Sequence, residues 1–140
     1  MIHESPESIL KQTITHRADS WGTGTADSAA IDNKGKGNFL FVLNFDDTAT
    51  ATLAISVLHR DVGGSFAIAT DDAGDPITVN IAASTSSRDV KIRVRADRLK
   101  DEVGLRVVVG VAANIFHSRC VQTGLDSADC DGAAAYDILV

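Results

Sequence analysis

The chain has 140 residues, of which 44% are hydrophobic and 23% are charged, and its formal net charge is −6. This length suits one domain with a two-layer core, and no apolar run reaches the roughly 20 residues that a membrane helix needs. Nucleic-acid binding relies on neutralising phosphates with Lys and Arg, so for this acidic chain we expect neither nucleic acid nor membrane as a partner.

The first 25 residues differ from the rest and predict an N-terminal arm or a short helix. Ser5 and Pro6 suit a helix start, but the Thr-Ile-Thr run ending at Thr15 favours extended chain. Three interpretations stay open: a frayed terminus, an arm packed on its own domain, or an arm docked on a neighbouring subunit. The stretch lacks a basic start followed by an apolar segment, so we expect synthesis in the host cytoplasm. Its candidate interface residues are Ile2, Ile9, Leu10 and Ile14.

Residues 26–122 are predicted to form a β-sandwich domain. Apolar and polar residues alternate over 38–46, 50–60, 65–70, 77–81, 89–95, 103–113 and 115–121, and a period of two is the mark of a strand. Turn residues separate these segments, and the spacing leaves no room for the crossover helices of a parallel sheet. We therefore predict an all-β protein, an antiparallel, jelly-roll-like β-sandwich of about eight strands with an N-terminal arm.

Two segments have strongly apolar patterns. Both faces of 38–46 are apolar, so this strand is predicted to be central and covered on both sides. In 103–113 the inward face is predicted to run from Leu105 through Val107 and Val109 to Val111.

Charge is distributed unevenly. Seven of the thirteen Lys and Arg lie between residues 88 and 106, whereas the last 21 residues carry four Asp and no Lys or Arg. Lys91, Arg93 and Arg95 form a row of cations on one strand face. Three interpretations stay open: a solvated outer face, a contact surface for an acidic protein, or a nucleic-acid site, although no stacking aromatic residue accompanies the row. The tail 123–140 is predicted to pack on the domain or a neighbouring subunit, with Tyr136, Ile138 and Leu139 as its interface residues. We hypothesise that the acidic tail meets the basic strand of an adjacent copy.

No catalytic constellation is recognisable, so we predict no enzymatic activity and no catalytic residue. His59 and Asp61 end a strand, and no nucleophile elbow accompanies them. No cofactor is expected.

The acidic turn near the C-terminus is the best metal candidate. Asp126, Asp129 and Asp131 are closely spaced, as calcium ligands are, but a solvated turn is the simpler interpretation because the full spacing of a calcium loop is missing. Cys120 and Cys130 form no zinc motif and are expected to be thiols, with a disulfide as the open alternative.

Several motifs resemble small β-sandwich proteins encoded among the head genes of tailed bacteriophages. The run 25–35 (Thr-Ala-Asp-Ser-Ala-Ala-Ile-Asp-Asn-Lys-Gly) precedes an aromatic strand, as in that family, and 63–66 (Gly-Gly-Ser-Phe) matches its Gly-Ser-x-Phe turn. The segments 105–109 (Leu-Arg-Val-Val-Val) and 116–119 (Phe-His-Ser-Arg) resemble its end. The resemblance covers roughly residues 23–119, lacks the family's Gly-Tyr and Lys-Arg-Tyr elements, and leaves about twenty residues beyond the family's end.

The resemblance implies a virion structural protein, most directly a capsid decoration (cement) protein at the capsid surface. Such a protein binds the shell of the major capsid protein and stabilises it, as any ligand stabilises the state that it binds. It also implies a homo-oligomer, with a trimer favoured. The alternatives are a tail or head–tail joining protein and a carbohydrate- or host-surface-binding module, for which Trp21 is the aromatic residue to test.

Overall fold

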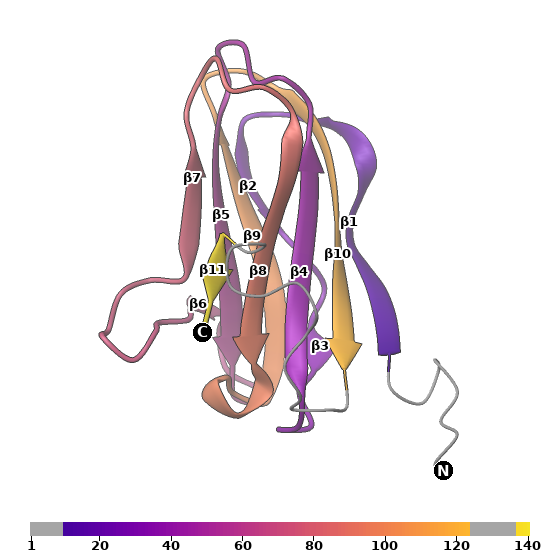
Figure 1. The fold of residues 1–140 in the computed structure, drawn as a ribbon, viewed down its shortest axis with the longest axis vertical. Helices are drawn as coiled ribbons and strands as arrows, with labels where there is room; N and C mark the ends of the chain where they lie inside the picture. The colour runs from indigo at the N-terminus through magenta and orange to yellow at the C-terminus, as the bar shows by residue number, and fades with distance from the viewer. Residues whose placement is uncertain (1–9, 124–136) are drawn as a thin grey trace.

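The computed structural model describes residues 10–123 and 137–140, which form two facing β-sheets (Figure 1). Sheet A contains β1 (Leu10–Trp21), β10 (Asn114–Thr123), β4 (Asn38–Phe45), β8 (Arg88–Arg95) and β11 (Ile138–Leu139), in that spatial order. Sheet B contains β2 (Gly24–Asp27), β9 (Glu102–Gly110), β5 (Thr52–Arg60) and β6 (Ala67–Ile68), with β3 (Ile31–Asp32) added to β9 and β7 (Thr78–Ile81) added to β5. The 3-10 turn η1 (Ala96–Arg98) joins β8 to β9, and no helix in the described residues is long and apolar enough to cross a membrane.

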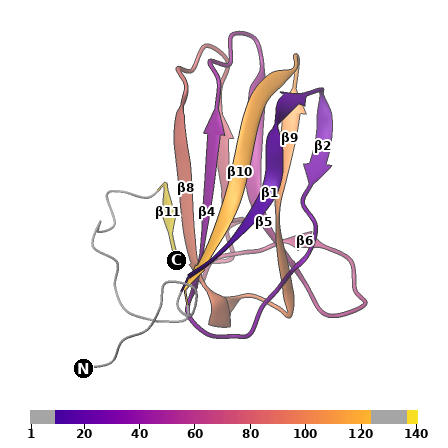
Figure 2. The ribbon, with the colours of Figure 1, turned by 90° about the vertical axis from the view of Figure 1, so that its right-hand side faces the viewer.

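The strand order is that of a jelly roll. With β2 and β3 counted as one strand and β6 and β7 as another, the strands before β11 are ordered 1-8-3-6 in sheet A and 2-7-4-5 in sheet B. Apart from β6 and β7, which pair with the preceding β5, each strand therefore pairs with one distant in sequence, as in the jelly rolls of capsid and lectin domains. The pairings are antiparallel except for β11 on β8. The predicted jelly-roll-like sandwich is confirmed, and Figure 2 shows its two layers from the side.

The core lies between the sheets and is built from the inward half of each alternating strand. Phe41 and Phe45 of β4 face Ile55 of β5 and Leu105 of β9, and all four side chains are at most 1% exposed. Burying each such side chain stabilises the fold by about 1.5–3 kcal/mol. Val42, on the outer side of β4, is only 4% exposed, so the prediction of a central strand covered on both sides is confirmed.

The strand β1 corrects the predicted boundary of the N-terminal arm. It pairs with β10 from Leu10 opposite Thr123 to Trp21 opposite Asn114, so the sandwich includes residue 10 and does not begin at residue 26. The register shifts twice, on either side of His16, and each shift interrupts the alternation that identifies a strand in a sequence. The predicted helix start at residues 5 and 6 lies outside the described residues.

The predicted inward position of Val111 is wrong. The strand β9 ends at Gly110, and Val111 lies in the following turn with a φ of 70° and 76% of its surface exposed. A left-handed conformation is rare for a β-branched residue, so the apolar pattern gave no warning of a turn here.

Candidate functional site

The outer face of sheet A brings together predicted interface residues from β1, β8 and β11, three strands that are far apart in the sequence. The strand register aligns their outward side chains in two rows that cross the sheet. We call these two rows the sheet A patch. The first row is Ile14, Arg119, Val42 and Lys91, and the second is Gln12, Val121, Leu40, Arg93 and Leu139.

The sheet A patch is both apolar and cationic. Ile14 is 67% exposed and Leu139 is 42% exposed, while Val42 lies in register between Lys91 and Arg119. Among the described residues, neither of these two cations has a carboxylate within ion-pair distance. Exposed apolar side chains at the two ends of the patch, with cations between them, are complementary to a protein surface that is acidic and partly apolar.

The described end of the tail lies on β8 of its own chain. The Asp137 amide donates to the Lys91 carbonyl at 2.8 Å, and the Asp137 carboxylate accepts from the Lys91 amide at 2.8 Å and from the Arg88 guanidinium at 2.9 Å. The amide of Val140 donates to the Arg93 carbonyl at 3.0 Å. For Asp137 the contact with a basic strand therefore forms within one chain. For the rest of the acidic tail, which lies outside the described residues, a contact between copies stays a prediction.

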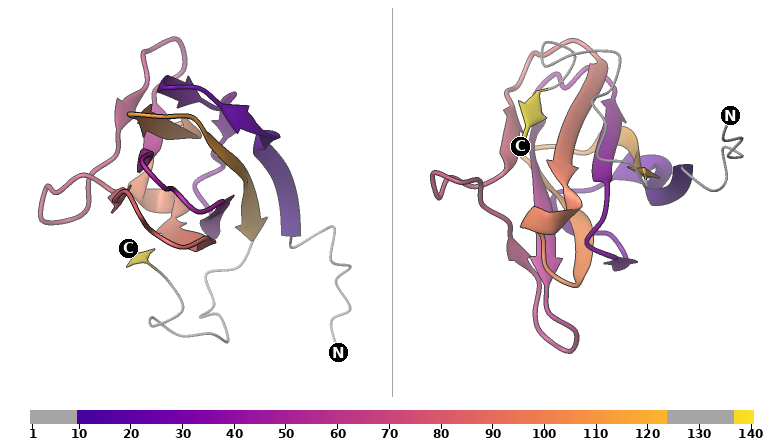
Figure 3. Two further views of the ribbon diagram at one scale, coloured as in Figure 1. Left: turned by 90° about the horizontal axis from the view of Figure 1, so that it is seen from above. Right: turned by 60° about the horizontal axis from the view of Figure 1, so that its bottom comes forward.

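The remaining predicted interface residues are dispersed. Arg95 lies on the same outer face but pairs with Asp97 at 2.8 Å, and half-buried Ile138 packs against the core. Leu10 opens β1. Figure 3 shows β11 beside β8, at the edge of sheet A opposite to β1. Outside the described residues lie Ile2, Ile9, Tyr136, Cys130 and the candidate calcium ligands Asp126, Asp129 and Asp131.

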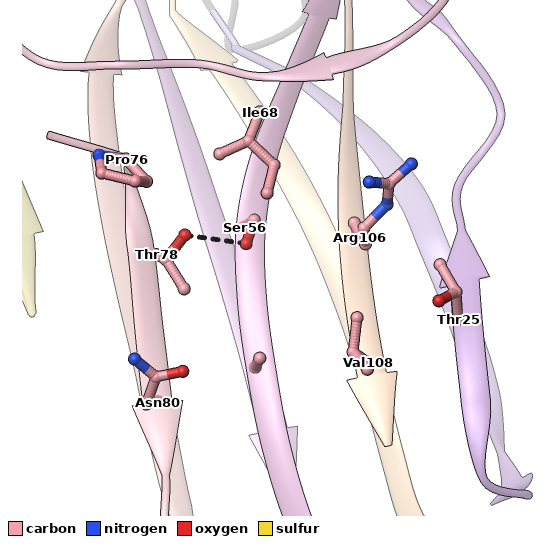
Figure 4. A pocket seen from close by; sticks show the side chains of 9 residues that line it. Thr25, Ser56, Ile68, Pro76, Thr78, Asn80, Arg106 and Val108 are labelled. Atoms are coloured by element: carbon pink, nitrogen blue, oxygen red, sulfur yellow. Dashed lines mark hydrogen bonds between the residues drawn. The ribbon is translucent and has the colours of Figure 1, made fainter. Parts of the chain in front are cut away.

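The outer face of sheet B is hollowed. A trough of about 590 Å³ lies over β5, and Figure 4 shows the side chains that flank it on β7, β9 and β2. The hollow forms because β5 carries only small outward side chains there, Ala54 and Ser56. We call this the sheet B trough. The residues around it are Thr25, Ile68, Pro76, Thr78, Asn80, Arg106 and Val108.

The polar groups of the sheet B trough are arranged in neutral pairs. Arg106 donates to both carboxylate oxygens of Asp27, at 2.7 and 2.9 Å, and these hydrogen bonds lower the pKa of Asp27. The Ser56 and Thr78 hydroxyls are hydrogen-bonded at 2.9 Å. Sequence reasoning missed this site; its signal was the small outward residues of the strand 50–60, which were interpreted only as solvated.

The edge between β1 and β2 holds a buried histidine. His16 is 3% exposed; its Nε2 donates to the Ala26 carbonyl at 3.0 Å, and its Nδ1 accepts from the Ser118 hydroxyl at 2.7 Å. Its ring meets Trp21 and Phe116 edge-on, and burial lowers its pKa. The pair Ser118–His16 resembles a nucleophile and its base, but Ser118 is 2% exposed and a carbonyl, not a carboxylate, holds the other ring nitrogen.

Other reactive groups have structural surroundings. Cys120 is a free thiol in the core, and desolvation raises its pKa to about 12, which makes it a poor nucleophile. The Nδ1 atom of His59 accepts from the Lys100 amide at 3.3 Å. Asp71 caps its own turn by accepting from the amides of Ala73 and Asp75 at 2.9 Å. Within 10–123 and 137–140 no three His, Cys, Asp or Glu residues gather as metal ligands would.

Comparison with solved structures finds a similar sandwich in chains of infectious bursal disease virus. A chain from the structure of infectious bursal disease virus, Gx strain, superimposes on 82% of this chain with a TM-score of 0.54 and 10% identity. A chain of the VP2 subviral particle of the same virus gives 0.52, again over 82% and at 10% identity. This chain spans 32% of the length of each. At such identity the likeness shows a shared β-sandwich fold.

Other comparisons add no family. The SPBc2 prophage-derived protein YomS matches 81% of this chain and 93% of its own at 12% identity, with a TM-score of 0.47, too low to carry an argument. No protein-family model matches the chain, and no curated protein sequence matches it.

Proposed function

We propose that this protein is a structural component of a virion and, specifically, a capsid decoration (cement) protein that binds the shell of the major capsid protein. The observation that carries the proposal is the sheet A patch. There exposed Ile14 lies beside Arg119, and among the described residues neither Arg119 nor Lys91 has a carboxylate within ion-pair distance. The fold shared with chains of infectious bursal disease virus and its VP2 subviral particle supports it. So do the motifs that resemble phage head proteins.

The proposed mechanism is mechanical. A folded module that binds across neighbouring capsid subunits adds its binding free energy to the assembled shell and none to the free subunits. By linkage this gain is about 2.7 kcal/mol when the free protein is present at 100 times its Kd. The cations of the patch contribute specificity and association rate towards an acidic shell surface. We place the protein at the capsid surface and favour a trimer, because a module at a threefold position repeats one contact three times.

The decisive experiment is co-sedimentation of the purified chain with shells assembled from the major capsid protein of the same genome. The wild-type chain is expected to pellet with shells at a saturable stoichiometry and to raise the temperature at which they disassemble. The double variant Lys91→Glu/Arg119→Glu is expected to bind at least about tenfold more weakly. The matched control is Lys34→Glu/Lys36→Glu, which makes the same charge change on exposed loop residues outside the patch.

Two results would reject the proposal. A wild-type chain that stays in the supernatant at all concentrations is not a decoration protein. Equal loss of binding in both double variants would mean that only net charge matters and that the patch is not the contact.

The structure also tests the aromatic residue on which a sugar-binding alternative relied. The Trp21 ring stacks on Phe116 at 5.3 Å between ring centroids, and its indole N–H lies 3.2 Å from the carbonyls of Arg17 and Phe116. Phe116 therefore covers one face of the Trp21 ring, and the indole N–H anchors the end of β1. Glycan binding that is lost in Trp21→Ala would favour the sugar-binding alternative.

A further inference from the structure

We propose that the sheet B trough is a binding site for a neutral saccharide chain. The trough is a second surface, on the opposite layer from the sheet A patch, and its volume of about 590 Å³ lies within the range of about 300–1,000 Å³ seen in small-molecule sites. It extends across β7, β5, β9 and β2, and the outward residues of β5 in its middle, Ala54 and Ser56, are small (Figure 4).

The ligand class follows from the polar groups of the trough. Arg106 presents donors and the neighbouring Asp27 presents acceptors, and together they form one neutral pair. The carboxylate therefore repels an anionic ligand, and the guanidinium repels a cationic one. A hydroxyl group both donates and accepts, and vicinal hydroxyls can engage both halves of the pair at once. The Thr78 hydroxyl, which is hydrogen-bonded to that of buried Ser56, has the same double capacity.

Two further side chains are available for such contacts. The Asn80 amide and the Thr25 hydroxyl are exposed at opposite walls, and neither makes a side-chain hydrogen bond to another described residue. They lie in one cross-strand row with Ala54 and Val108, while Thr78, Ser56, Arg106 and Asp27 form the next row. Apolar groups at the floor and ends suit the C–H faces of a sugar ring; they are Ala54, Val108, Ile68 and Pro76.

An extended peptide fits this surface less well. Peptides usually join a sheet at its edge, where backbone N–H and C=O groups are unpaired. In the trough, β5 is paired with β7 on one side and with β9 on the other, so its backbone groups are used within the sheet. Only side chains are therefore left to hydrogen-bond a ligand, and the polar side chains here can both donate to and accept from hydroxyl groups. Without an aromatic platform we expect weak, millimolar binding that gains from repetition on an oligomer.

This inference is independent of the proposed function. The two surfaces lie on opposite outer faces of the sandwich, so one can be engaged while the other remains open. A shell-binding assay that fails leaves the trough untouched, and a trough that binds no sugar leaves the shell-binding proposal untouched.

The test is an NMR titration of the isotope-labelled full chain with neutral trisaccharides built from glucose, galactose, N-acetylglucosamine and rhamnose. Sialyllactose and a neutral Ala/Ser/Thr hexapeptide serve as the anionic and peptide comparators. At least one neutral trisaccharide is expected to shift amide signals of β5, β7 and β9 around the trough in a saturable way.

Variants locate the site. Ala54→Leu fills the floor and is expected to weaken binding at least about tenfold, whereas Ala18→Leu, the same change on exposed β1, leaves it within about twofold. Asp27→Asn removes the acceptor charge beside Arg106 and is expected to weaken neutral sugars while admitting sialyllactose. Dispersed amide spectra confirm that each variant is folded.

The proposal is overturned by three results. These are no saturable shift with any neutral trisaccharide, shifts produced only by sialyllactose or the peptide, and shifts scattered away from the trough or unchanged by both Ala54→Leu and Asp27→Asn.

Discussion

The two inner faces of this sandwich are alike, whereas its two outer faces are not. Outward positions of sheet A carry large apolar and cationic side chains, among them Val42, Lys91 and Arg119. Those of sheet B are small or neutralised, as Ala54 is small and Arg106 is bound to Asp27. The fold dictates apolar residues at every second position only, so the other half of each strand is free to carry function. Here one outer face carries an apolar and cationic patch, and the other is hollowed.

The largest expected effect comes from removing residues 137–140, which seal the β8 edge beside the sheet A patch. Ile138 and Val140 are half-buried against the core, and backbone hydrogen bonds to β8 hold the residues at both ends of β11. Their loss is expected to cost about 2–4 kcal/mol of unfolding free energy, from apolar burial and from about three hydrogen bonds. Urea unfolding followed by the single Trp measures this.

The truncation also tests how the sheet A face is bounded. An open β8 edge invites pairing with another chain, so the truncated protein is expected to form larger assemblies than the wild type in sedimentation runs, while Asp137→Asn in the full chain keeps the assembly state of the wild type. Unchanged stability after truncation would show that the β11 contact contributes nothing in solution.

The next effect lies at the edge where the two sheets meet. Replacing His16 by Gln removes a hydrogen bond to Ala26 in sheet B and edge-on contacts with Trp21 and Phe116. We expect a loss of about 2–3 kcal/mol. Thermal unfolding of the wild type and the variant, at one pH above 7, gives this difference in stability. Equal stability of the two proteins would mean that the contacts of His16 do not stabilise the junction of the two sheets.

The same residue predicts a pH dependence. Burial lowers the pKa of His16 in the folded protein below its ordinary value of 6.5, so the unfolded chain takes up the proton first as the pH falls. The stabilising contribution is therefore complete above about pH 6.5 and is lost as the pH decreases below it. Wild-type stability should fall from pH 7 to pH 5 more steeply than that of His16→Gln, and parallel curves would contradict this assignment.

Two smaller effects on stability distinguish a closely packed position of the sheet B outer face from an open one. A Cβ atom at Gly104 would lie 3.0 Å from the Ser28 hydroxyl and 3.5 Å from the Phe66 ring, so Gly104→Val is expected to cost about 2 kcal/mol by overpacking. Ala54 faces the open trough, so Ala54→Val should change stability by less than about 0.5 kcal/mol. Chemical denaturation of both variants measures the difference, and equal costs would mean that the trough is not open space.

The sequence was sufficient for the strands whose alternation is uninterrupted. The segments around Phe41, Ile55, Ile92 and Leu105 were assigned from their period of two, because that period records burial on one side. It was insufficient where the backbone departs from it, at the register shifts beside His16 and at the left-handed turn of Val111.

The candidate sites show the same limit. Lys91 and Ile14 were identified separately as interface residues, but that they share one face depends on β1 pairing with β10 and β10 pairing with β4, which no local pattern encodes. The trough was missed because small outward residues carry no signal until β7 and β9 are known to wall them.

The smallest expected effect concerns the charge contrast between the two outer faces. Asp27 and Arg106 are partly exposed, so breaking their pair with Asp27→Asn should cost only about 0.2–1 kcal/mol at neutral pH. The hydrogen bonds from Arg106 lower the pKa of Asp27, so the pair stabilises the fold above the ordinary pKa of about 3.8 and this contribution is lost as the pH falls through the lowered value. A double-mutant cycle with Arg106→Gln, measured by thermal unfolding at pH 7, isolates the coupling. A coupling energy near zero would mean that the ion pair between Asp27 and Arg106 does not stabilise the fold. The charge difference between the two outer faces would then have no energetic consequence at Arg106.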